Sequence, residues 1–273
     1  MKNKSTAYQD KSEEFDSAGT PDYLEKTQSQ LPALEFLIKM GWEYLPPESV
    51  VELRNGRLGS VILDSVLSEH IRTNCFYEFK GSRHLFTENA VQNAVQELKS
   101  FRGNGAISEN EEVYDLLCLG ISLPQTVEGD TKSFNINYID WKNPENNTYQ
   151  CTAEFKVERV GHQEHRIPDI VLFVNGIPLV VIECKRGSYT DVNKDPIEMA
   201  VRQFARNQRK DEIPQLFLYS QIHLALARNR ASYGTTGTKE KFWTVWRESG
   251  IKGDKFLDRK STRLNSSHVS ISY

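Results

Sequence analysis

The sequence has few cysteines, and none of them belongs to a closely spaced pair. The four are spread through the 273 residues as Cys75, Cys118, Cys151 and Cys184, without a C-x-x-C motif. This spacing fits neither a structural zinc site nor a dense disulfide framework. We therefore expect a reducing environment and predict a cytoplasmic protein.

Long apolar runs are missing too. The longest, IVLFV and PLVVI, are far too short to span a bilayer, and the opening MKNKSTAYQDKSEEFD lacks the apolar core of a signal peptide. The content of 38% hydrophobic and 26% charged residues nevertheless excludes a disordered chain. We expect a soluble protein with a buried core and no membrane partner, and the length leaves one or two domains open.

Charge is divided unevenly between the two parts of the chain. The net charge of −3 combines 18 Lys and Arg against 28 Asp and Glu in residues 1–185 with 16 against 9 in residues 186–273. A basic part can form a nucleic-acid face, because cations gain free energy at phosphates by releasing counterions. An unevenly charged solvated surface is the alternative, and charge alone favours it.

Two helices are indicated in the first half of the chain. Residues 20–41 have helical spacing of apolar residues and end at a glycine, which predicts a helix or a helix pair. Residues 87–101 repeat the pattern behind a possible Thr87 cap. Residues 102–110, which follow the second predicted helix, resemble a loop.

The period changes to that of strands from residue 134 onward. Apolar and polar residues alternate in 134–138 and 149–157, which predicts two half-buried strands separated by the Asn- and Pro-rich turn 140–147. Residues 167–187 hold two apolar runs around Asn-Gly, which predicts a hairpin. Because both faces of these runs are apolar, we place the hairpin in the centre of the sheet.

A further helix is predicted over residues 195–209, with Asp195 as its N-cap and Pro196 in its first turn. Further β-rich runs are QLFLYS, HLALA and FWTVW. The Ser-rich end, residues 261–273, resembles vector-derived sequence and is set aside. We thus predict one domain over residues 1–260, with additional segments on its N-terminal side.

The candidate chemistry lies on the predicted hairpin. Asp169 begins its first strand, and Glu183 and Lys185 stand two residues apart on its second. Two neighbouring carboxylates can hold a divalent metal, which phosphodiester hydrolysis uses to neutralise charge and generate hydroxide. Lys185 would share a strand face with Glu183 and could reach the scissile phosphate or attacking water.

The register of the hairpin decides whether this site can form. A two-residue turn at Asn175-Gly176 would pair Val174 with Ile177 and leave Asp169 and Glu183 on opposite faces. A three-residue loop or a bulge would bring them together, and bulges often redirect side chains beside active sites. We therefore predict an irregularity between the two carboxylates.

An isolated E-x-K motif has little specificity, because both residue types are common at strand ends. A structural ion pair between Lys185 and a carboxylate is the alternative to catalysis. Charges at the end of an otherwise apolar strand cost free energy unless they have partners or a function. This placement favours a functional site.

The segment RIPDIVLFVNGIPLVVIECKRG resembles the D…E-x-K hairpin of the PD-(D/E)xK nucleases, and specifically the restriction subunit of type I restriction-modification enzymes. LEFLIKMGWEYLP, FNINYIDWKNPENNTYQ and QLFLYSQ extend the likeness over residues 20–245. The resemblance implies an α/β (α+β) fold, a mixed, mainly antiparallel sheet flanked by helices. It also implies that Asp169 and Glu183 bind Mg²⁺, for which Mn²⁺ can substitute, and that Lys185 is catalytic.

The resemblance further implies cleavage of double-stranded DNA beside methyltransferase and specificity subunits. In that family an ATP-driven translocase follows the nuclease. The loop GTTGTKEKF lacks phosphate-loop spacing, so ATP binding is expected only in that motor. Alternatives are a stand-alone repair or junction nuclease on the same core, and a non-catalytic DNA-binding or docking module.

The family also has a Q-x-x-x-Y motif after the lysine, thought to position DNA. Gln203 matches it, whereas Asn207 stands where tyrosine is expected. Arg202, Arg206 and Arg209 form a cationic stripe on the same helix that suits phosphates, and a solvated helix face is the alternative. The DNA-binding residues predicted are Gln203, Arg202 and Arg206.

Related nucleases often take one more acidic residue from an early helix. Glu25, Glu35 and Glu88 all compete for that role, and the sequence does not choose among them. His162 and His165 lack the helical H-E-x-x-H spacing of zinc proteases and are predicted to be surface residues.

Overall fold

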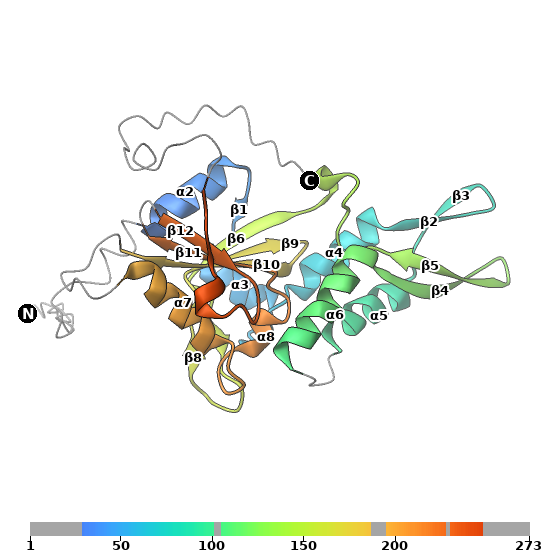
Figure 1. The fold of residues 1–273 in the computed structure, drawn as a ribbon. Coiled ribbons are helices and arrows are strands. Elements are labelled where there is room, and N and C mark those ends of the chain that lie inside the picture. Colours follow the sequence, from blue (N-terminus) through green and yellow to red (C-terminus); the bar gives the residue numbers. More distant parts are fainter. Residues whose placement is uncertain (1–28, 101–104, 187–194, 228–229, 248–273) are drawn as a thin grey trace, which may run out of the picture.

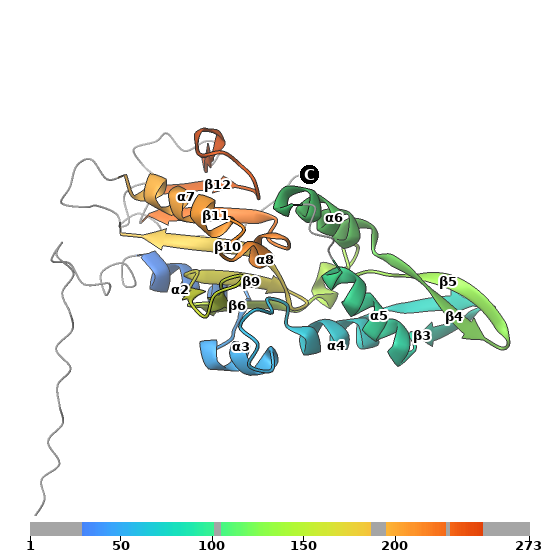
Figure 2. The same ribbon diagram turned by 90° about the horizontal axis from the view of Figure 1, so that it is seen from below.

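The computed structural model describes residues 29–100, 105–186, 195–227 and 230–247. Figures 1 and 2 show a central sheet with helices on its faces and, at one end, an arm of hairpins joined to helices. The predicted tail 261–273 and residues 20–28 of the first predicted helix lie outside the described residues. Among the described helices, none has the length and apolar character needed to cross a membrane.

The central sheet has seven strands in the order β1-β6-β9-β10-β11-β12-β13. Only the β1/β6 and β10/β11 pairs are parallel, and the others are antiparallel. The predicted mixed, mainly antiparallel sheet with a central hairpin is therefore confirmed. The strands are β1 (Glu43–Tyr44), β6 (Tyr149–Ala153), β9 (Ile170–Val174), β10 (Ile177–Lys185), β11 (Ile222–Ala227), β12 (Arg230–Gly234) and β13 (Thr244–Val245).

The two faces of the sheet are covered by different helices. Helix α2 (Leu31–Lys39) packs Leu34 and Leu37 into a cluster that includes Ile182 and Cys184 of β10. Helix α7 (Pro196–Asn207) covers the opposite face, where it packs against β10 and β11. Because successive side chains of a strand point to opposite faces, Glu183 and Lys185 face α7.

Helix α7 begins as its sequence predicts. The Asp195 carboxylate accepts hydrogen bonds from the backbone N–H groups of Ile197 (2.8 Å) and Glu198 (3.3 Å). These bonds satisfy two of the donors that a helix N-terminus leaves without a partner. Burial of Val201 and Phe204 then fixes the helix on the sheet.

Replacing Asp195 by alanine is expected to lower the free energy of unfolding by about 1 kcal/mol, because the capping bonds are lost. Asp195→Asn keeps a side-chain acceptor and should lose much less. Urea denaturation of both variants checks this. Equal losses would show that the ion pair with Arg230, 2.9 Å away, matters more than the cap.

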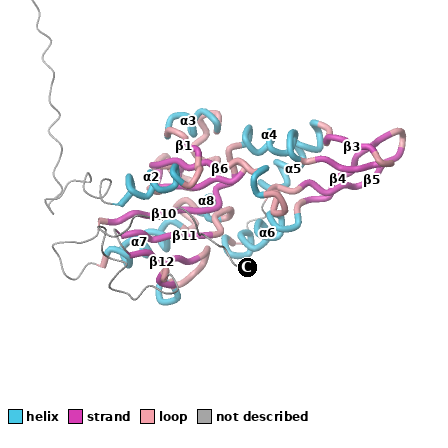
Figure 3. The backbone as a smooth tube through the Cα atoms, turned by 90° about the horizontal axis from the view of Figure 1, so that it is seen from above, coloured by secondary structure: helices cyan, strands magenta, loops and turns pink. Residues whose placement is uncertain are grey.

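The arm is built from segments before residue 137. Helices α4 (Asp64–Asn74), α5 (Glu88–Lys99) and α6 (Ala106–Leu119) join it to the core, and a shorter helix, α3 (Pro47–Leu53), lies beside the sheet. In Figure 3 the hairpins β2–β3 (Phe76–Phe79, Ser82–Leu85) and β4–β5 (Ile121–Val127, Asp130–Ile136) extend away from the sheet. The rings of Tyr77 and Phe134 stack 4.2 Å apart between them.

Several local predictions are wrong or incomplete. Residues 106–110, predicted as loop, are the first turns of α6. QLFLYS, predicted as β-rich, lies mostly in the short helix α8 (Pro214–Phe217) and the turn after it. The strand predicted over 149–157 is interrupted at Glu154, whose φ of +52° breaks the extended backbone, and continues as β7 (Val157–Glu158), which pairs with β8 (His165–Arg166).

Other predicted elements are present, but with different bounds or in a different sheet. The helix predicted over residues 87–101 is α5 (Glu88–Lys99), residue 101 lies outside the described residues, and Thr87 accepts a hydrogen bond from the Ala90 N–H as the N-cap. Of the strand predicted at 134–138, only residues 134–136 are in a strand, the end of β5, which belongs to the arm instead of the main sheet. FWTVW contributes only the two-residue β13, after a 3-10 turn at Glu240–Phe242.

Candidate active site

The site is built on the β9–β10 hairpin. Asn175 and Gly176 both have positive φ, +52° and +79°, as a two-residue type I′ turn requires. A Cβ on Gly176 would lie 2.6 Å from the Leu63 carbonyl oxygen, so a side chain there would clash. The buried Asn175 side chain bonds the Thr148 N–H and the Tyr138 carbonyl, which fixes the turn to neighbouring segments.

The register of the hairpin shifts, as predicted, at a bulge on Leu179. Paired residues are Ile177 with Val174 and Pro178 with Phe173, and then Val180 with Leu172 and Ile182 with Ile170. Leu179 is thus an extra residue of β10. The next rung places Glu183 beside Asp169, and their side chains point to the same face.

The two carboxylates have different surroundings. Glu183 is fully buried, whereas the side chain of Asp169 is 25% exposed. Asp169 Oδ2 accepts a 2.6 Å hydrogen bond from the Cys184 N–H, and Glu183 Oε2 accepts one of 2.6 Å from Gln203 Nε2. Glu183 Oε1 is buried and accepts no hydrogen bond from the described residues.

Lys185 completes the cluster from the end of β10. Its side chain is largely buried, with Nζ 3.9 Å from Asp169 Oδ2 and 3.2 Å from the Cys184 carbonyl, to which it donates. A separation of 3.9 Å is longer than a hydrogen bond. The structure therefore brings together Asp169, Glu183 and Lys185, the three residues singled out by the sequence.

Burial raises the pKa of Glu183 well above its usual value. The neighbouring charge of Asp169 raises this pKa further, as does a hydrogen bond that only protonated Glu183 can donate to Asp169, while Lys185 and Arg206 oppose the shift. Ionisation of both carboxylates is therefore unfavourable even with Lys185 nearby, unless a further cation binds between them. A metal ion between the carboxylates would relieve both the burial and the repulsion.

The donors present suit a hard divalent cation. Two carboxylates meet on one face, and the buried Oε1 of Glu183 has a free acceptor position for a ligand bond. The described residues contain no group of three or more His, Cys, Asp or Glu side chains that could hold a metal. Mg²⁺ is commonly held by one or two carboxylates with water and phosphate oxygens completing its shell, so the fit is with that ion class.

The residues of helix α7 that were predicted to bind DNA differ in how close they lie to the carboxylates. Gln203 bonds Glu183 directly. Asn207 is 1% exposed, and its Oδ1 accepts 3.2 Å hydrogen bonds from Nε and Nη2 of Arg206. Arg202 is 68% exposed and lies near Glu198 and Glu240. The predicted DNA contacts of these residues remain predictions.

The early acidic residues lie elsewhere. Glu88 forms a bidentate ion pair with Arg72 at the start of α5, Glu35 is exposed on α2, and Glu25 lies outside the described residues. Instead, the side chains of Ser29 and Gln30 reach the two strands of the candidate site. They bond the Lys185 carbonyl and the Asp169 carbonyl, contacts for which the sequence carries no local signal.

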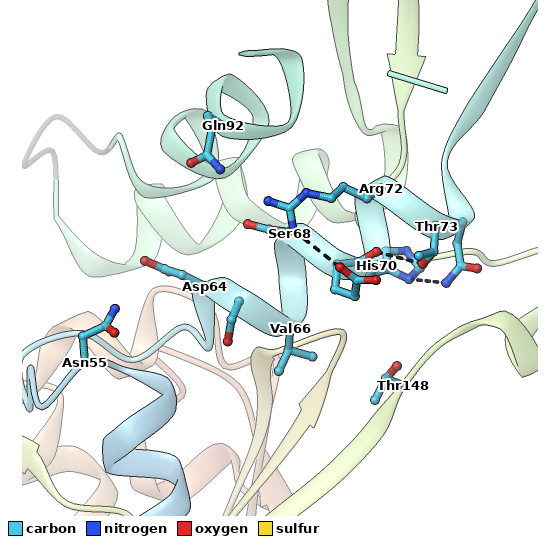
Figure 4. A pocket seen from close by; sticks show the side chains of 12 residues that line it. Asn55, Asp64, Val66, Ser68, His70, Arg72, Thr73, Gln92 and Thr148 are labelled. Carbon is cyan, nitrogen blue, oxygen red and sulfur yellow. Dashed lines mark hydrogen bonds and ion pairs between the residues drawn. The ribbon is translucent and has the colours of Figure 1, made fainter. Parts of the chain in front are cut away.

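A separate polar groove of about 720 Å³ lies along α4 and contains none of the three site residues (Figure 4). Its side chains are engaged with one another: Arg72 pairs with Glu69, and Asn74 bonds the ring of His70. Burial lowers the pKa of His70 to about 4. The groove is therefore not the candidate active site.

Comparison with known proteins agrees with this architecture. The family described as "Type I restriction enzyme R protein N terminus" matches residues 22–242. The chain belongs to this family. The match includes the whole of the β9–β10 hairpin and α7.

The relatives that this chain resembles are named as endonuclease subunits of type I restriction enzymes. The HindI endonuclease subunit of Haemophilus influenzae is 28% identical over 219 residues, 78% of this chain and 19% of that protein. From Methanocaldococcus jannaschii, the MjaVIIIP subunit is 28% identical over 211 residues (76% and 18%), and the MjaVIIP subunit is 37% identical over 133 residues (48% and 11%). The chain thus spans about a fifth of the length of the first two relatives.

Proposed function

We propose that this chain is the nuclease part of a type I restriction enzyme R subunit and cleaves double-stranded DNA with Mg²⁺. The observation that carries the proposal is the meeting of Asp169, Glu183 and Lys185 on one face of the hairpin. Membership of the restriction R family supports a nuclease role, and the relatives are named as endonuclease subunits.

Asp169 and Glu183 would hold the ion, which when bound supplies charge neutralisation and a more acidic water. Lys185 places an ammonium 3.9 Å from Asp169, where it can stabilise negative charge on a phosphate that lies against the carboxylates. Gln203 donates to Glu183 and holds the orientation of that carboxylate. Arg206, partly buried on the same helix, adds positive charge toward the site.

The wider assembly is part of the same proposal. An ATP-driven translocase would accompany this domain in the full-length subunit, as the resemblance to type I restriction subunits implies. The chain spans about a fifth of the length of the first two relatives, which leaves room for such a motor. Methyltransferase and specificity subunits would be its partners, with double-stranded DNA as the substrate. We further propose a cytoplasmic location, where DNA and reduced cysteines occur together.

Binding of Mn²⁺, measured by calorimetry, tests the metal site. Asp169→Asn is expected to weaken binding at least about 10-fold, because one of two charged ligands becomes neutral while an acceptor for the Cys184 N–H remains. Asp130→Asn is the matched control, since this exposed residue lies on the distant β5.

Asp130→Asn should bind Mn²⁺ with the same affinity as the wild type. If Asp169→Asn also binds Mn²⁺ like the wild type, the acidic pair is structural and the chain is a DNA-binding or docking module. Metal-dependent conversion of supercoiled plasmid to nicked and linear forms then distinguishes a nuclease from a metal-binding module.

A further inference from the structure

Asp169 and Lys185 both lie where their strands end. Asp169 directly precedes Ile170, the first residue of β9, and Lys185 is the last residue of β10. A residue at the end of a strand has paired neighbours in only one direction along the chain, so its pairing opens more readily than pairing at the centre of the strand. The separation of the two side chains therefore depends on whatever secures these ends.

Two side chains before α2 contact both ends. Ser29 Oγ donates a 2.7 Å hydrogen bond to the Lys185 carbonyl, and Gln30 Nε2 donates one of 2.9 Å to the Asp169 carbonyl. Both residues are only 6% exposed. The Asp169 carbonyl also accepts the Glu154 N–H at 2.8 Å, so its peptide group is held from two directions.

The helix that follows these residues is itself anchored to the same strand. Leu34 and Leu37 of α2 pack with Ile182 and Cys184 on the face of β10 opposite the candidate site. Movement of Ser29 and Gln30 is therefore limited by apolar packing one to two turns away. The side chains of Ser29 and Gln30 hydrogen-bond the backbone carbonyls of Lys185 and Asp169, so they act on the position of these residues.

We propose that Ser29 and Gln30 are positioning residues, whose paired hydrogen bonds hold the end of β9 against the end of β10 and so set the separation of the Asp169 carboxylate and the Lys185 ammonium. The orientation of a strand peptide fixes the direction of its Cβ, so release of either carbonyl lets the adjacent side chain turn. The 2.6 Å bond from the Cys184 N–H to Asp169 Oδ2 spans the same two strand ends and depends on the same alignment.

The role in metal binding rests on the proposed function, and the role in strand alignment does not. The test variant is Ser29→Ala with Gln30→Met, which removes both donors and keeps the length of the glutamine side chain. The structural control is Asn110→Ala. Asn110 is also buried and also bonds backbone carbonyls, those of Phe217, Leu218 and Ser220, but it lies on α6.

Two measurements are made on the whole chain: Mn²⁺ affinity by calorimetry, and hydrogen exchange of the Cys184 amide by NMR in the absence of metal. The double variant is expected to bind Mn²⁺ about 10-fold more weakly, as is usual when groups that orient metal ligands are removed, and to exchange faster at Cys184. Asn110→Ala should lose stability with both quantities unchanged. Ser29→Thr keeps a hydroxyl donor and, in the Gln30 wild-type background, should retain the original affinity.

The inference would be overturned if the double variant had the wild-type Cys184 exchange rate and Mn²⁺ affinity. It would also be overturned if Asn110→Ala changed both quantities as much as the double variant does, because that result would indicate general destabilisation. If the wild type bound no Mn²⁺, the proposed metal site would fail, while Cys184 exchange would still decide whether the two residues hold the strand ends.

Discussion

Replacing Lys185 by methionine is expected to lower the rate of DNA cleavage by about 100- to 1000-fold, the usual cost of removing one group that stabilises transition-state charge. Methionine keeps most of the length and apolar stem of lysine, so packing at the end of β10 should survive. Mn²⁺ affinity should not fall, because an ammonium 3.9 Å from Asp169 competes with the metal for the carboxylates. The rate is measured on supercoiled plasmid, in the full-length subunit if the rest of it is needed for cleavage.

Lys142→Met serves as the control, because Lys142 is exposed in the turn before β6. It should cleave at the wild-type rate. A Lys185→Met protein that lost metal affinity in parallel with activity would point to a structural ion pair as the role of this lysine.

Glu183→Gln is expected to stabilise the metal-free protein while it abolishes Mn²⁺ binding. Glu183 is fully buried beside Asp169, and its pKa is raised by burial and by that neighbouring charge. Glutamine removes the buried charge and keeps an oxygen that can accept from Gln203. The gain should be roughly 1–3 kcal/mol, and each kcal/mol should raise Tm by about 2–4 °C.

The pH dependence of this gain follows from the direction of the shift. Because the pKa of Glu183 is higher in the folded than in the unfolded chain, the proton it holds stabilises the fold below the unfolded pKa. This stabilisation is lost as pH rises through the folded pKa. The advantage of Glu183→Gln should thus be small at low pH and grow with pH.

Thermal unfolding with a chelator, across pH, measures this difference. Glu164→Gln, an exposed glutamate before β8, is the control and should show no such gain. Equal Tm values for Glu183→Gln and the wild type at every pH would show that the charge of the buried Glu183 carboxylate does not destabilise the fold.

The hairpin and its site could be predicted because their signals are local. Asn-Gly between two apolar runs defines the turn, and the alternation of faces along the strands then requires a bulge if the carboxylates are to meet. The bulge at Leu179 confirms that geometric reasoning. Asp195 and Pro196 marked the start of α7 in the same way, through the chemistry of a helix N-terminus.

Helix α6 was missed because its apolar pattern is weak. Gly105 before it offers no side-chain cap, and Tyr114 and Leu119 are exposed although apolar residues were expected to mark the buried face. QLFLYS failed for a different reason, since a short apolar run has no period that separates strand from buried helix. Pro214 at its start was the better signal for a helical turn.

Contacts between distant segments were beyond prediction from one sequence. The hydrogen bonds of Ser29 and Gln30 join residues 156 and 139 positions apart. No spacing rule connects such residues, because their approach is decided by how α2 packs on the sheet. The arm was hidden for a related reason, since the alternation in its strands does not say which sheet they join.

The extra residue at Leu179 makes the meeting of Asp169 and Glu183 depend on the bulge itself. If the present sequence paired regularly through Leu179, Ile182 would lie opposite Asp169, and Glu183 and Lys185 would turn toward α2, where Cys184 and Ile182 now pack. Deletion of Leu179 would leave five residues between the turn and each acid, so the two acids would stay opposite each other without a bulge. Loss of a residue from β9 would instead increase the mismatch to two residues, so the two strands differ in the length changes that they tolerate.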